Sequence, residues 1–352
     1  MPLCGCKNVT SFLEPRNSMK TFPSSPDLFD AIGNTPLIRL ANLTAAIDRT
    51  ILGKAEFLNP GGSVKDRAAK FIIEDAERAG RLRPGGTIVE GTAGNTGIAL
   101  TMLGNARGYK SIIVTPDDQS AEKIELLRVL GADVRLVPAT PFTNPENYYH
   151  VAQSIAQSLP GAVWADQFNN LANARGHYET TGPEIWSACG EQLDAFVTSA
   201  GTGGTFAGVS VALKERKPKL LTVVADPMGS AMYSYVKNGT LDVEGDSVAE
   251  GIGIKRVTEN FRTAVADDAI RIDDITMVEM AYYLLREEGL LLGGSAALNV
   301  AAAARIALRL PPKSVVATVL CDGGSRYLSR LYNAQWLAEN GLVPQQRGLT
   351  FL

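Results

Sequence analysis

The sequence predicts an α/β fold in which a mainly parallel sheet carries helices on both faces. Seven short runs rich in β-branched and other apolar residues are spaced along the chain, at residues 87–90, 111–115, 133–137, 162–165, 195–198, 221–225 and 314–320. Helical periodicity fills most of the intervals between them, and this alternation favours parallel strands joined by crossover helices. With 352 residues, 45% of them hydrophobic, the chain can bury the core of one large α/β domain or of two closely joined ones.

The charge balance favours small polar ligands over polymers or membranes. The chain has 34 Lys and Arg against 37 Asp and Glu, without a long run of one sign, so neither nucleic acid nor a lipid surface is expected as a partner. The longest apolar tract, residues 289–304, is short for a membrane span and is interrupted by Gly293, Gly294, Ser295 and Asn299. It predicts a buried strand, turn and helix.

The cysteines and the N-terminal segment favour a reducing compartment. Cys4, Cys6, Cys189 and Cys321 are too sparse for a disulfide framework. Cys4 and Cys6 lack a nearby histidine or second cysteine pair, so a free, flexible tail over residues 1–26 is favoured and no metal site is expected. The tail has no apolar secretory core, although its basic bias leaves an organelle transit peptide open. We therefore expect a cytoplasmic protein.

The first candidate for chemistry is Lys65. Ser63 is a good N-cap for a helix that runs to about residue 79, and Lys65 heads its apolar face. That face consists of Ala68, Ala69, Ile72, Ile73 and Ala76. A buried ammonium group is costly, so Lys65 snorkels, forms an ion pair, or is neutral and nucleophilic, and periodicity alone favours snorkelling. A carbonyl cofactor would favour the nucleophile, because a desolvated lysine amine is the usual partner in an imine.

A second candidate joins the strand at residues 195–198 to a helix that begins near Phe206. It consists of Gly201, Thr202, Gly203, Gly204 and Thr205, named here the 201–205 loop. Glycines let main-chain N–H groups converge on an anion, and the helix dipole and two hydroxyls complete a cup for one phosphate. The spacing fits neither a dinucleotide nor a nucleoside-triphosphate motif. Simple turn chemistry remains an equal alternative for this loop taken alone.

A third candidate follows the strand at residues 87–90. It consists of Thr92, Ala93, Gly94, Asn95 and Thr96, named here the 92–96 loop, and a helix is expected to begin at Asn95 or Thr96. Its N–H groups and hydroxyls predict a second anion site, with helix capping as the better interpretation of Asn95 or Thr96 alone. A phosphate cup and a carboxylate cup together indicate a phosphorylated cofactor that meets an amino acid.

In combination these segments resemble the cysteine synthase (O-acetylserine sulfhydrylase) and cystathionine β-synthase family of fold-type II pyridoxal-phosphate enzymes, from about residue 27 to residue 331. The matching motifs are Ile32-Gly33-Asn34-Thr35-Pro36-Leu37, Gly62-Ser63-Val64-Lys65-Asp66-Arg67, Gly94-Asn95-Thr96-Gly97, Gln167-Phe168-Asn169-Asn170, the 201–205 loop and Glu250-Gly251-Ile252-Gly253. The resemblance implies two α/β domains of the tryptophan synthase β type with the cofactor in the cleft between them. We place one domain at residues 40–169, the larger one at 27–39 and 170–340, and a C-terminal tail at 341–352.

The resemblance also implies roles for individual residues. Lys65 would form the internal imine with pyridoxal 5'-phosphate and later move the α-proton, while the 201–205 loop would hold the phosphate. Asn95 would bond the ring hydroxyl and Ser295 would face the ring nitrogen, where a neutral hydroxyl favours loss of a β-leaving group over transamination. The 92–96 loop and Gln167 would bind the substrate carboxylate. The implied reaction eliminates acetate from O-acetyl-L-serine to an enzyme-bound aminoacrylate, which adds sulfide to give L-cysteine.

Departures from the family pattern leave the substrate open. Ala93 stands where serine is common in the family, and Cys321-Asp322-Gly323-Gly324 replaces a Ser/Gly-rich stretch near the cofactor ring. Cystathionine β-synthase or cyanoalanine synthase activity and a non-catalytic regulatory homologue are therefore kept as alternatives. Cys321 is expected as a buried hydrophobe or a redox-sensitive neighbour, and His177 as a structural hydrogen-bonding residue. The family is usually homodimeric, and serine acetyltransferase is a possible partner by resemblance.

Overall fold

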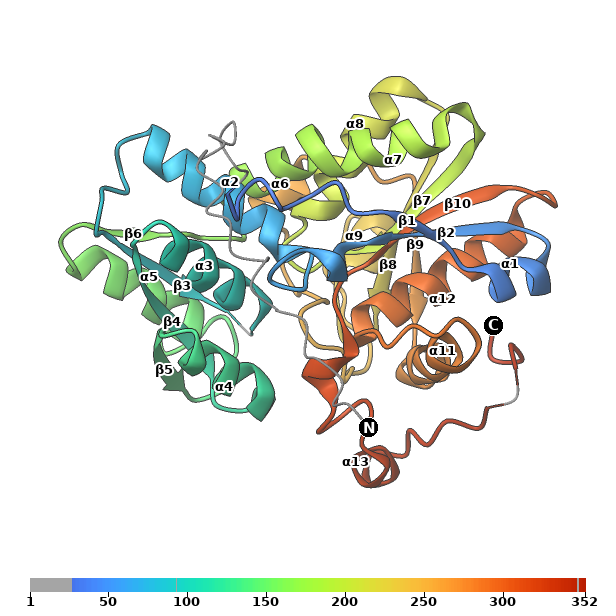
Figure 1. Ribbon diagram of the computed structural model, residues 1–352. Helices are drawn as coiled ribbons and strands as arrows, with labels where there is room; N and C mark the ends of the chain where they lie inside the picture. The colour runs from blue at the N-terminus through green and yellow to red at the C-terminus, as the bar shows by residue number, and fades with distance from the viewer. Residues whose placement is uncertain (1–26, 93, 347) are drawn as a thin grey trace, which may run out of the picture.

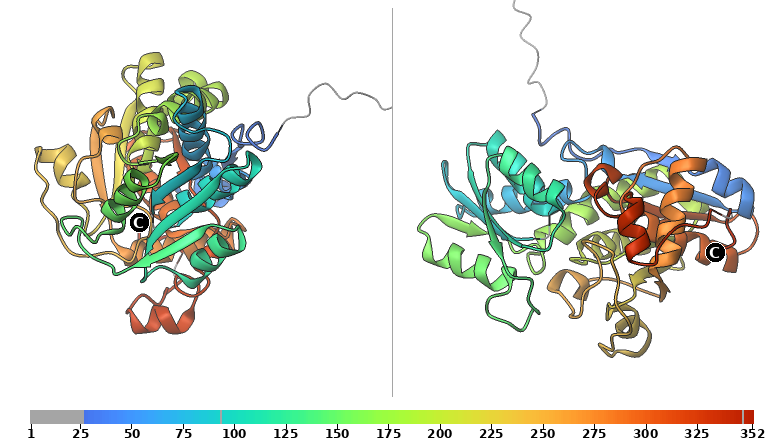
Figure 2. Two further views of the ribbon diagram at one scale, coloured as in Figure 1. Left: turned by 90° about the vertical axis from the view of Figure 1, so that its left-hand side faces the viewer. Right: turned by 90° about the horizontal axis from the view of Figure 1, so that it is seen from below.

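The chain folds around two sheets that lie in separate lobes of the computed structural model (Figures 1 and 2). The structure describes residues 27–92, 94–346 and 348–352. The larger sheet has six strands in the order β1-β2-β10-β7-β8-β9, and the smaller has four in the order β5-β4-β3-β6. Neighbouring strands are parallel except for the antiparallel pair β1 and β2. The α/β class with two mainly parallel sheets is therefore confirmed.

All seven strands expected from the sequence are present, with small shifts at their ends. The larger sheet contains β1 (Leu37–Arg39), β2 (Thr50–Ala55), β7 (Leu193–Ser199), β8 (Leu221–Pro227), β9 (Asp268–Ile272) and β10 (Val315–Leu320). The smaller sheet contains β3 (Thr87–Gly91), β4 (Lys110–Pro116), β5 (Asp133–Val137) and β6 (Ala162–Trp164). β1, β2 and β9 are not among the strands expected from the sequence.

The position of β2 corrects the expected boundary at residue 40. β2 pairs in parallel with β10, from Thr50 opposite Val315 to Ala55 opposite Leu320, and therefore belongs to the larger sheet. Gly53 makes this pairing possible, because a Cβ atom there would lie 2.6 Å from the Leu320 side chain. Residues 40–55 thus belong with the larger sheet and not with the 40–169 unit. A strand that pairs with a partner about 260 residues away in the sequence has no local pattern that predicts the pairing.

Helices cover both faces of each sheet (Figure 1). Around the smaller sheet lie α2 (Lys65–Arg78), α3 (Asn95–Ala106), α4 (Ala121–Val129) and α5 (Tyr148–Ser158). The remaining helices are α1 (Ala41–Ile47), α6 (Ala172–Gly176), α7 (Gly182–Cys189), α8 (Gly204–Arg216), α9 (Met232–Asn238), α10 (Glu259–Arg262), α11 (Asp274–Glu287), α12 (Gly294–Arg309) and α13 (Ala334–Glu339).

Alternating side chains of the strands build separate cores on the two faces of each sheet. In β3, Ile88 packs with α2 and α3, whereas the next residue, Val89, packs against α5 on the other face. In β8, Val223 packs with α11 and α12, whereas Val224 faces the core that contains α8. Sheets buried on both faces in this way place ligands at the carboxyl ends of their strands.

The apolar tract at residues 289–304 forms the turn and the helix that the sequence predicts, without the strand. α12 begins at Gly294, and ahead of it Leu292 forms only an isolated bridge to Gly323. α12 is buried along most of its length because its Ala-rich surface packs closely on β7 and β10. Among the described residues, no helix is both long and apolar enough to cross a bilayer.

Candidate active site

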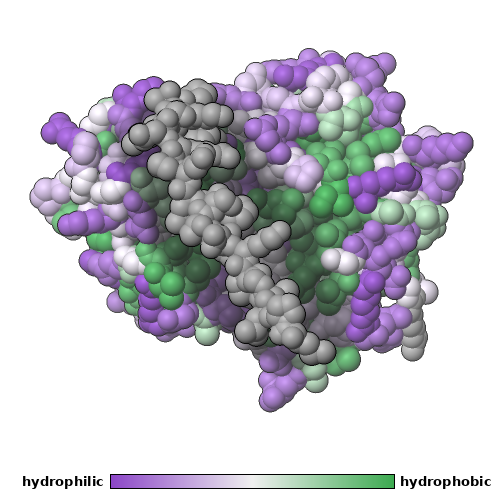
Figure 3. Space-filling model, viewed as in Figure 1, coloured by the Kyte–Doolittle hydropathy of each residue, from purple (hydrophilic) through white to green (hydrophobic). Residues whose placement is uncertain are grey.

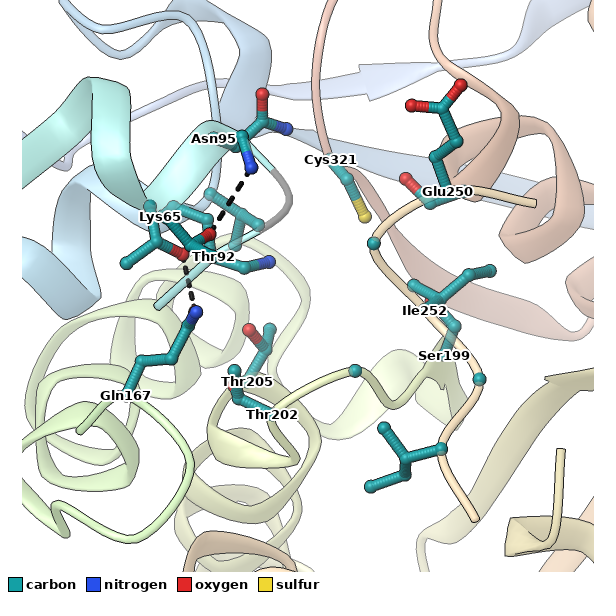
Figure 4. Close-up of a pocket in the computed structure, with 18 of the residues that line it drawn as sticks. Lys65, Thr92, Asn95, Gln167, Ser199, Thr202, Thr205, Glu250, Ile252 and Cys321 are labelled. Carbon is teal, nitrogen blue, oxygen red and sulfur yellow. Dashed lines mark hydrogen bonds between the residues drawn. The ribbon is translucent and has the colours of Figure 1, made fainter. Parts of the chain in front are cut away.

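The residues singled out in the sequence converge on a cavity of about 220 Å³ between the two sheets (Figure 4). Lys65, Thr92, Gly94, Asn95, Thr96, Gln167, Gly201, Thr202, Gly203, Thr205 and Ser295 all line it. Gly204 does not line it, and Ala93 lies outside the described residues, as do Cys4, Cys6 and the whole 1–26 tail. The cavity is also lined by Glu250 and Cys321, which the sequence placed in matching or neighbouring segments without a role, and by residues not singled out there, among them Lys123, Tyr148, Ser199 and Tyr327.

Lys65 is delivered to the cavity by the first turn of α2. The expected cap is displaced by one residue: Val64 occupies the N-cap position, and the Ser63 hydroxyl accepts a 3.3 Å hydrogen bond from the Lys65 N–H. The buried Asp66 carboxyl group accepts from the Gly61 N–H and so fixes the turn that precedes the helix. Lys65 therefore faces the cavity from a rigid helix start, whereas its apolar neighbours in α2 pack into the core of the smaller lobe.

The 201–205 loop lies at the carboxyl end of β7 and leads into α8. Its glycines are required because other residues pack too closely against the loop to leave room for Cβ atoms. A Cβ atom on Gly201 would lie 2.3 Å from the Gly251 carbonyl oxygen, and one on Gly203, where φ is +85°, would lie 2.7 Å from the Phe261 side chain. The first N–H groups of a helix lack acceptors within that helix and carry its positive end. The helix starts at Gly204, two residues earlier than expected, between Gly203 and Thr205, which both line the cavity.

His177 supports the loop from behind, as a hydrogen-bonding residue. Its Nε2 lies 3.1 Å from the Thr205 hydroxyl and its Nδ1 lies 2.8 Å from the Thr181 hydroxyl. Complete burial, with further contributions from Arg67 and Lys65, depresses the pKa of His177 well below 6.5. The ring is therefore neutral at physiological pH and orients a hydroxyl instead of contributing charge.

The 92–96 loop faces the same cavity from the smaller sheet. Gly94, with φ at +145°, accommodates a bend that residues with a Cβ atom rarely adopt, and its N–H donates to the Thr92 hydroxyl over 3.3 Å. The Thr96 hydroxyl donates to Oε1 of Gln167, which ties this loop to the segment after β6. Since Oε1 accepts in this contact, any further hydrogen bond of the Gln167 side chain is donated by its amide group, which also lies within reach of the buried Glu90 carboxyl group.

A neutral hydroxyl and a neutral thiol form part of the cavity wall. Ser295 lies in the first turn of α12, beside Cys321. Burial raises the pKa of the Cys321 thiol to about 11, although Lys65 and Ser295 oppose the rise. The Asn299 amide also donates to Cys321 Sγ over 3.3 Å. A protonated, hydrogen-bonded thiol fits the hydrophobe expected at this position better than a reactive thiolate.

The donor set fits pyridoxal phosphate. A loop of glycines and hydroxyls at a helix start suits one phosphate, and Lys65 is an amine positioned for the aldehyde. Ser295 offers a hydroxyl to a ring nitrogen, and the 92–96 loop offers neutral donors to a carboxylate. The cavity is large enough for such a ring and a small amino acid, which together have far less bulk than a dinucleotide.

Comparison with known proteins agrees with this geometry. The family model described as pyridoxal-phosphate dependent enzyme matches residues 28–322. The chain therefore belongs to the pyridoxal-phosphate dependent enzymes, and pyridoxal phosphate is its cofactor.

Within that family the similarity is to cysteine synthases and related β-replacement enzymes. Cysteine synthase 1 of Emericella nidulans is 52% identical over 90% of this chain and 86% of its own. O-acetylserine dependent cystathionine β-synthase from Helicobacter pylori is similar in structure, with a TM-score of 0.78, 36% identity, and coverage of 87% of this chain and 98% of its own. O-ureido-L-serine synthase gives a TM-score of 0.81 at 36% identity, covering 90% of this chain and all of its own.

Proposed function

We propose that this protein is a cysteine synthase, which converts O-acetyl-L-serine and sulfide to L-cysteine and acetate. The observation that carries the proposal is the convergence of Lys65, the 201–205 loop and the 92–96 loop on one cavity. An amine, a phosphate cup and a carboxylate cup within one cavity suit an amino acid bound beside a phosphorylated aldehyde. Cysteine synthase 1 of E. nidulans, 52% identical, supports the choice of reaction.

Each part of the site has a role in this proposal. The bound cofactor supplies the electron sink that lets the α-proton leave and the β-substituent depart. Lys65 holds the cofactor, and its Nζ takes the α-proton and later returns it. Thr202, Thr205 and the N–H groups at the start of α8 hold the phosphate. Ser295 faces the ring nitrogen, and Asn95 the ring oxygen.

The substrate is oriented by the opposite wall. The Thr92 hydroxyl and main-chain N–H groups of the 92–96 loop, that of Thr96 included, bind its carboxylate together with an N–H group of Gln167. This fixes the β-carbon near Lys65, where the carbon–oxygen bond to acetate breaks and a carbon–sulfur bond forms.

One specific observation favours a second candidate nucleophile. The H. pylori enzyme with a TM-score of 0.78 is named an O-acetylserine dependent cystathionine β-synthase. Homocysteine could therefore replace sulfide at the same β-carbon without any change in the groups that hold cofactor and O-acetylserine. Cyanide, or serine as the donor, extends the same chemistry.

The absorption spectrum of the purified protein tests these assignments. Adding O-acetyl-L-serine should shift the visible cofactor band to longer wavelength, and sulfide should restore the original band with release of cysteine. Lys65→Ala is the matched control and should bind cofactor without this cycle. Restoration by homocysteine alone would move the assignment to cystathionine synthesis. A band unchanged by O-acetylserine, serine or cysteine would overturn the enzyme assignment.

We also propose a cytoplasmic homodimer able to bind the C-terminal segment of serine acetyltransferase. Apolar side chains gather on the larger lobe in the view of Figure 3, where grouped surface apolar residues are typical of protein contacts. Light scattering on the full chain should give twice the monomer mass of 37.5 kDa. A synthetic acetyltransferase C-terminal peptide should compete with O-acetylserine for the cavity, and a fluorescent fusion of the full chain should remain outside organelles.

A further inference from the structure

The side chain of Asn95 is held between two charged residues of the larger lobe. Asn95 Nδ2 donates to Asp322 Oδ2 over 2.6 Å, and Arg326 Nη1 donates to Asn95 Oδ1 over 2.6 Å. Asn95 begins α3 in the smaller lobe, whereas Asp322 and Arg326 follow β10, and Asn95 and Lys65 both line the cavity (Figure 4). We propose that Asp322 and Arg326 are positioning residues that fix the Asn95 amide so that its remaining N–H group faces the ring oxygen of the cofactor.

The charges of Asp322 and Arg326 determine the orientation of the Asn95 amide. Exchanging the amide oxygen and nitrogen would set oxygen against the Asp322 carboxylate and N–H groups against the Arg326 guanidinium. Both charge-assisted hydrogen bonds would be lost, and both replaced contacts would be repulsive. In the observed orientation one of the two N–H groups on Nδ2 is used by Asp322. The other remains available for a cofactor oxygen.

Asp322 is itself fixed by its surroundings. It is fully buried, and its Oδ2 also accepts a 2.6 Å hydrogen bond from the Tyr327 hydroxyl. Its main chain forms a bridge to Ser63, just ahead of Lys65, and its carbonyl accepts from the Gly293 N–H over 3.0 Å, just ahead of Ser295. A Cβ atom on Gly293 would lie 2.2 Å from Asp322 Oδ1. The carboxylate is thus placed by the segments that carry the proposed cofactor residues.

Arg326 connects the amide to the turn before α2. Besides Asn95, its guanidinium donates to the Gly61 carbonyl, and a Cβ atom on Gly62 would lie 3.0 Å from its Nη2. One side chain therefore spans the loop that delivers Lys65 and the residue that begins α3. A shift in either element would disturb the Asn95 amide.

The proposal rests on the cofactor and not on the nucleophile, so its test measures cofactor binding and not turnover. Apoenzymes of the wild type, Asn95→Ala, Asp322→Ala and the double variant are titrated with pyridoxal phosphate. Both the dissociation constant and the ratio of the visible to the near-ultraviolet cofactor band are recorded. A hydrogen-bond donor to the ring oxygen stabilises its deprotonated, visible-absorbing form, so losing the donor should lower this ratio.

Asp322→Ala should raise the dissociation constant about tenfold, the effect of losing one well-oriented charged contact. It should also lower the band ratio, and the double variant should be no worse than Asn95→Ala, because Asp322 acts through Asn95. Asp322→Asn, which keeps an acceptor for Asn95 and Tyr327, should restore most of the ratio. Asp226→Asn is the matched control: Asp226 is a fully buried aspartate in β8 that does not line the cavity, and its variant should keep the wild-type ratio.

Three results would overturn the proposal: additive effects of Asn95→Ala and Asp322→Ala, tighter cofactor binding by Asp322→Ala, or an unchanged band ratio with only a lower melting temperature. Should Asp322→Ala fail to fold, Arg326→Gln tests the other half of the clamp, because Arg326 is partly exposed. It should reproduce the lower ratio and the non-additivity with Asn95→Ala. A wild-type ratio of the two cofactor bands in Arg326→Gln would also contradict the proposal.

Discussion

His177 and Thr205 are joined by a 3.1 Å contact between Nε2 and the hydroxyl oxygen, so a neutral imidazole orients a hydroxyl of the loop proposed to hold phosphate. A cationic ring would still attract phosphate, but the folded protein does not favour that form. Complete burial makes a charged imidazole costly, and Arg67 and Lys65 are nearby positive charges. The loop therefore depends on orientation, and acid should act on it through folding stability.

We expect His177→Gln to weaken the acid sensitivity of the fold. The folded-state pKa of His177 lies well below the usual 6.5, so below that pH the unfolded chain binds a proton that the folded chain does not. Stability contributed by neutral His177 is therefore lost as pH falls, by up to about 1.4 kcal/mol per pH unit. Urea unfolding at several pH values between about 7.5 and 5 should show a shallower loss in the variant. His150→Gln is the control, and equal slopes for wild type and His177→Gln would contradict the expectation.

Asp66 should produce the opposite dependence on pH. Burial raises its pKa from 3.8 to about 7, against the opposing Gly61 hydrogen bond and Arg326 charge. Between those values the unfolded carboxyl group ionises while the folded one keeps its proton, so stability is lost as pH rises. Asp66→Asn keeps an acceptor for the Gly61 N–H and removes the titration. Relative to wild type, its unfolding free energy should increase by up to about 1.4 kcal/mol per pH unit between about pH 4 and 7. A constant difference across that range would show that Asp66 titrates normally.

Gly203→Ala should separate backbone strain from damage to the proposed phosphate site. At Gly203 a Cβ atom would lie 2.7 Å from the Phe261 side chain and 2.8 Å from its nitrogen, and φ is +85°. Gly239, with φ at +74° and nothing within 4 Å of its Cβ position, is the matched control. Both alanines should cost about 1 kcal/mol for the left-handed backbone. Only Gly203→Ala should also reduce cofactor affinity, by about tenfold or more, because the loop must move away from Phe261. Equal affinities in equilibrium dialysis would argue against this loop as the phosphate site.

The local parts of the fold were accessible from the sequence because they depend on local patterns. The runs that became β3, β4, β7 and β8 are apolar and bounded by turn residues, and the helix starts at Lys65 and Asn95 follow glycine-rich turns. Ligands of parallel sheets bind at the carboxyl ends of the strands, and the glycine and threonine residues after β3 and β7 do lie together at one cavity. Local sequence patterns were sufficient to predict these strands and helix starts.

The remaining parts depend on contacts between distant residues. β2 is a strand because β10 lies beside it, and the expected boundary at residue 40 failed for that reason. Asp322 was noted only as a departure from the family pattern, since nothing near it in the sequence indicates that it meets Asn95, 227 residues away. An aspartate two residues after a predicted strand, followed by two glycines, was the available signal.

Glu250 joins the two lobes beside the cavity, and its removal should cost much more folding stability than removal of Arg330, its more exposed partner. Glu250 pairs with Lys123 of α4 over 2.5 Å and with Arg330 over 3.1 Å. Lys123 is only 3% exposed, with its ammonium group 4.4 Å from the centre of the Tyr327 ring, whereas Arg330 is partly exposed. Glu250→Ala leaves the Lys123 charge buried with only an aromatic face to stabilise it. The expected cost is about 3 kcal/mol, against less than about 1 kcal/mol for Arg330→Ala.

The double variant Lys123→Met/Glu250→Ala distinguishes a buried unpaired charge from lost packing. Removing both charges removes the desolvation penalty that Glu250→Ala exposes, so the double variant should be more stable than Glu250→Ala alone. Urea unfolding of the wild type, Lys123→Met, Glu250→Ala and the double variant gives the interaction free energy between Lys123 and Glu250 directly. Added salt should change this free energy little, because the pair is buried. Additive losses, or an effect of Arg330→Ala as large as that of Glu250→Ala, would show that the lobes are held by packing and not by this ion pair.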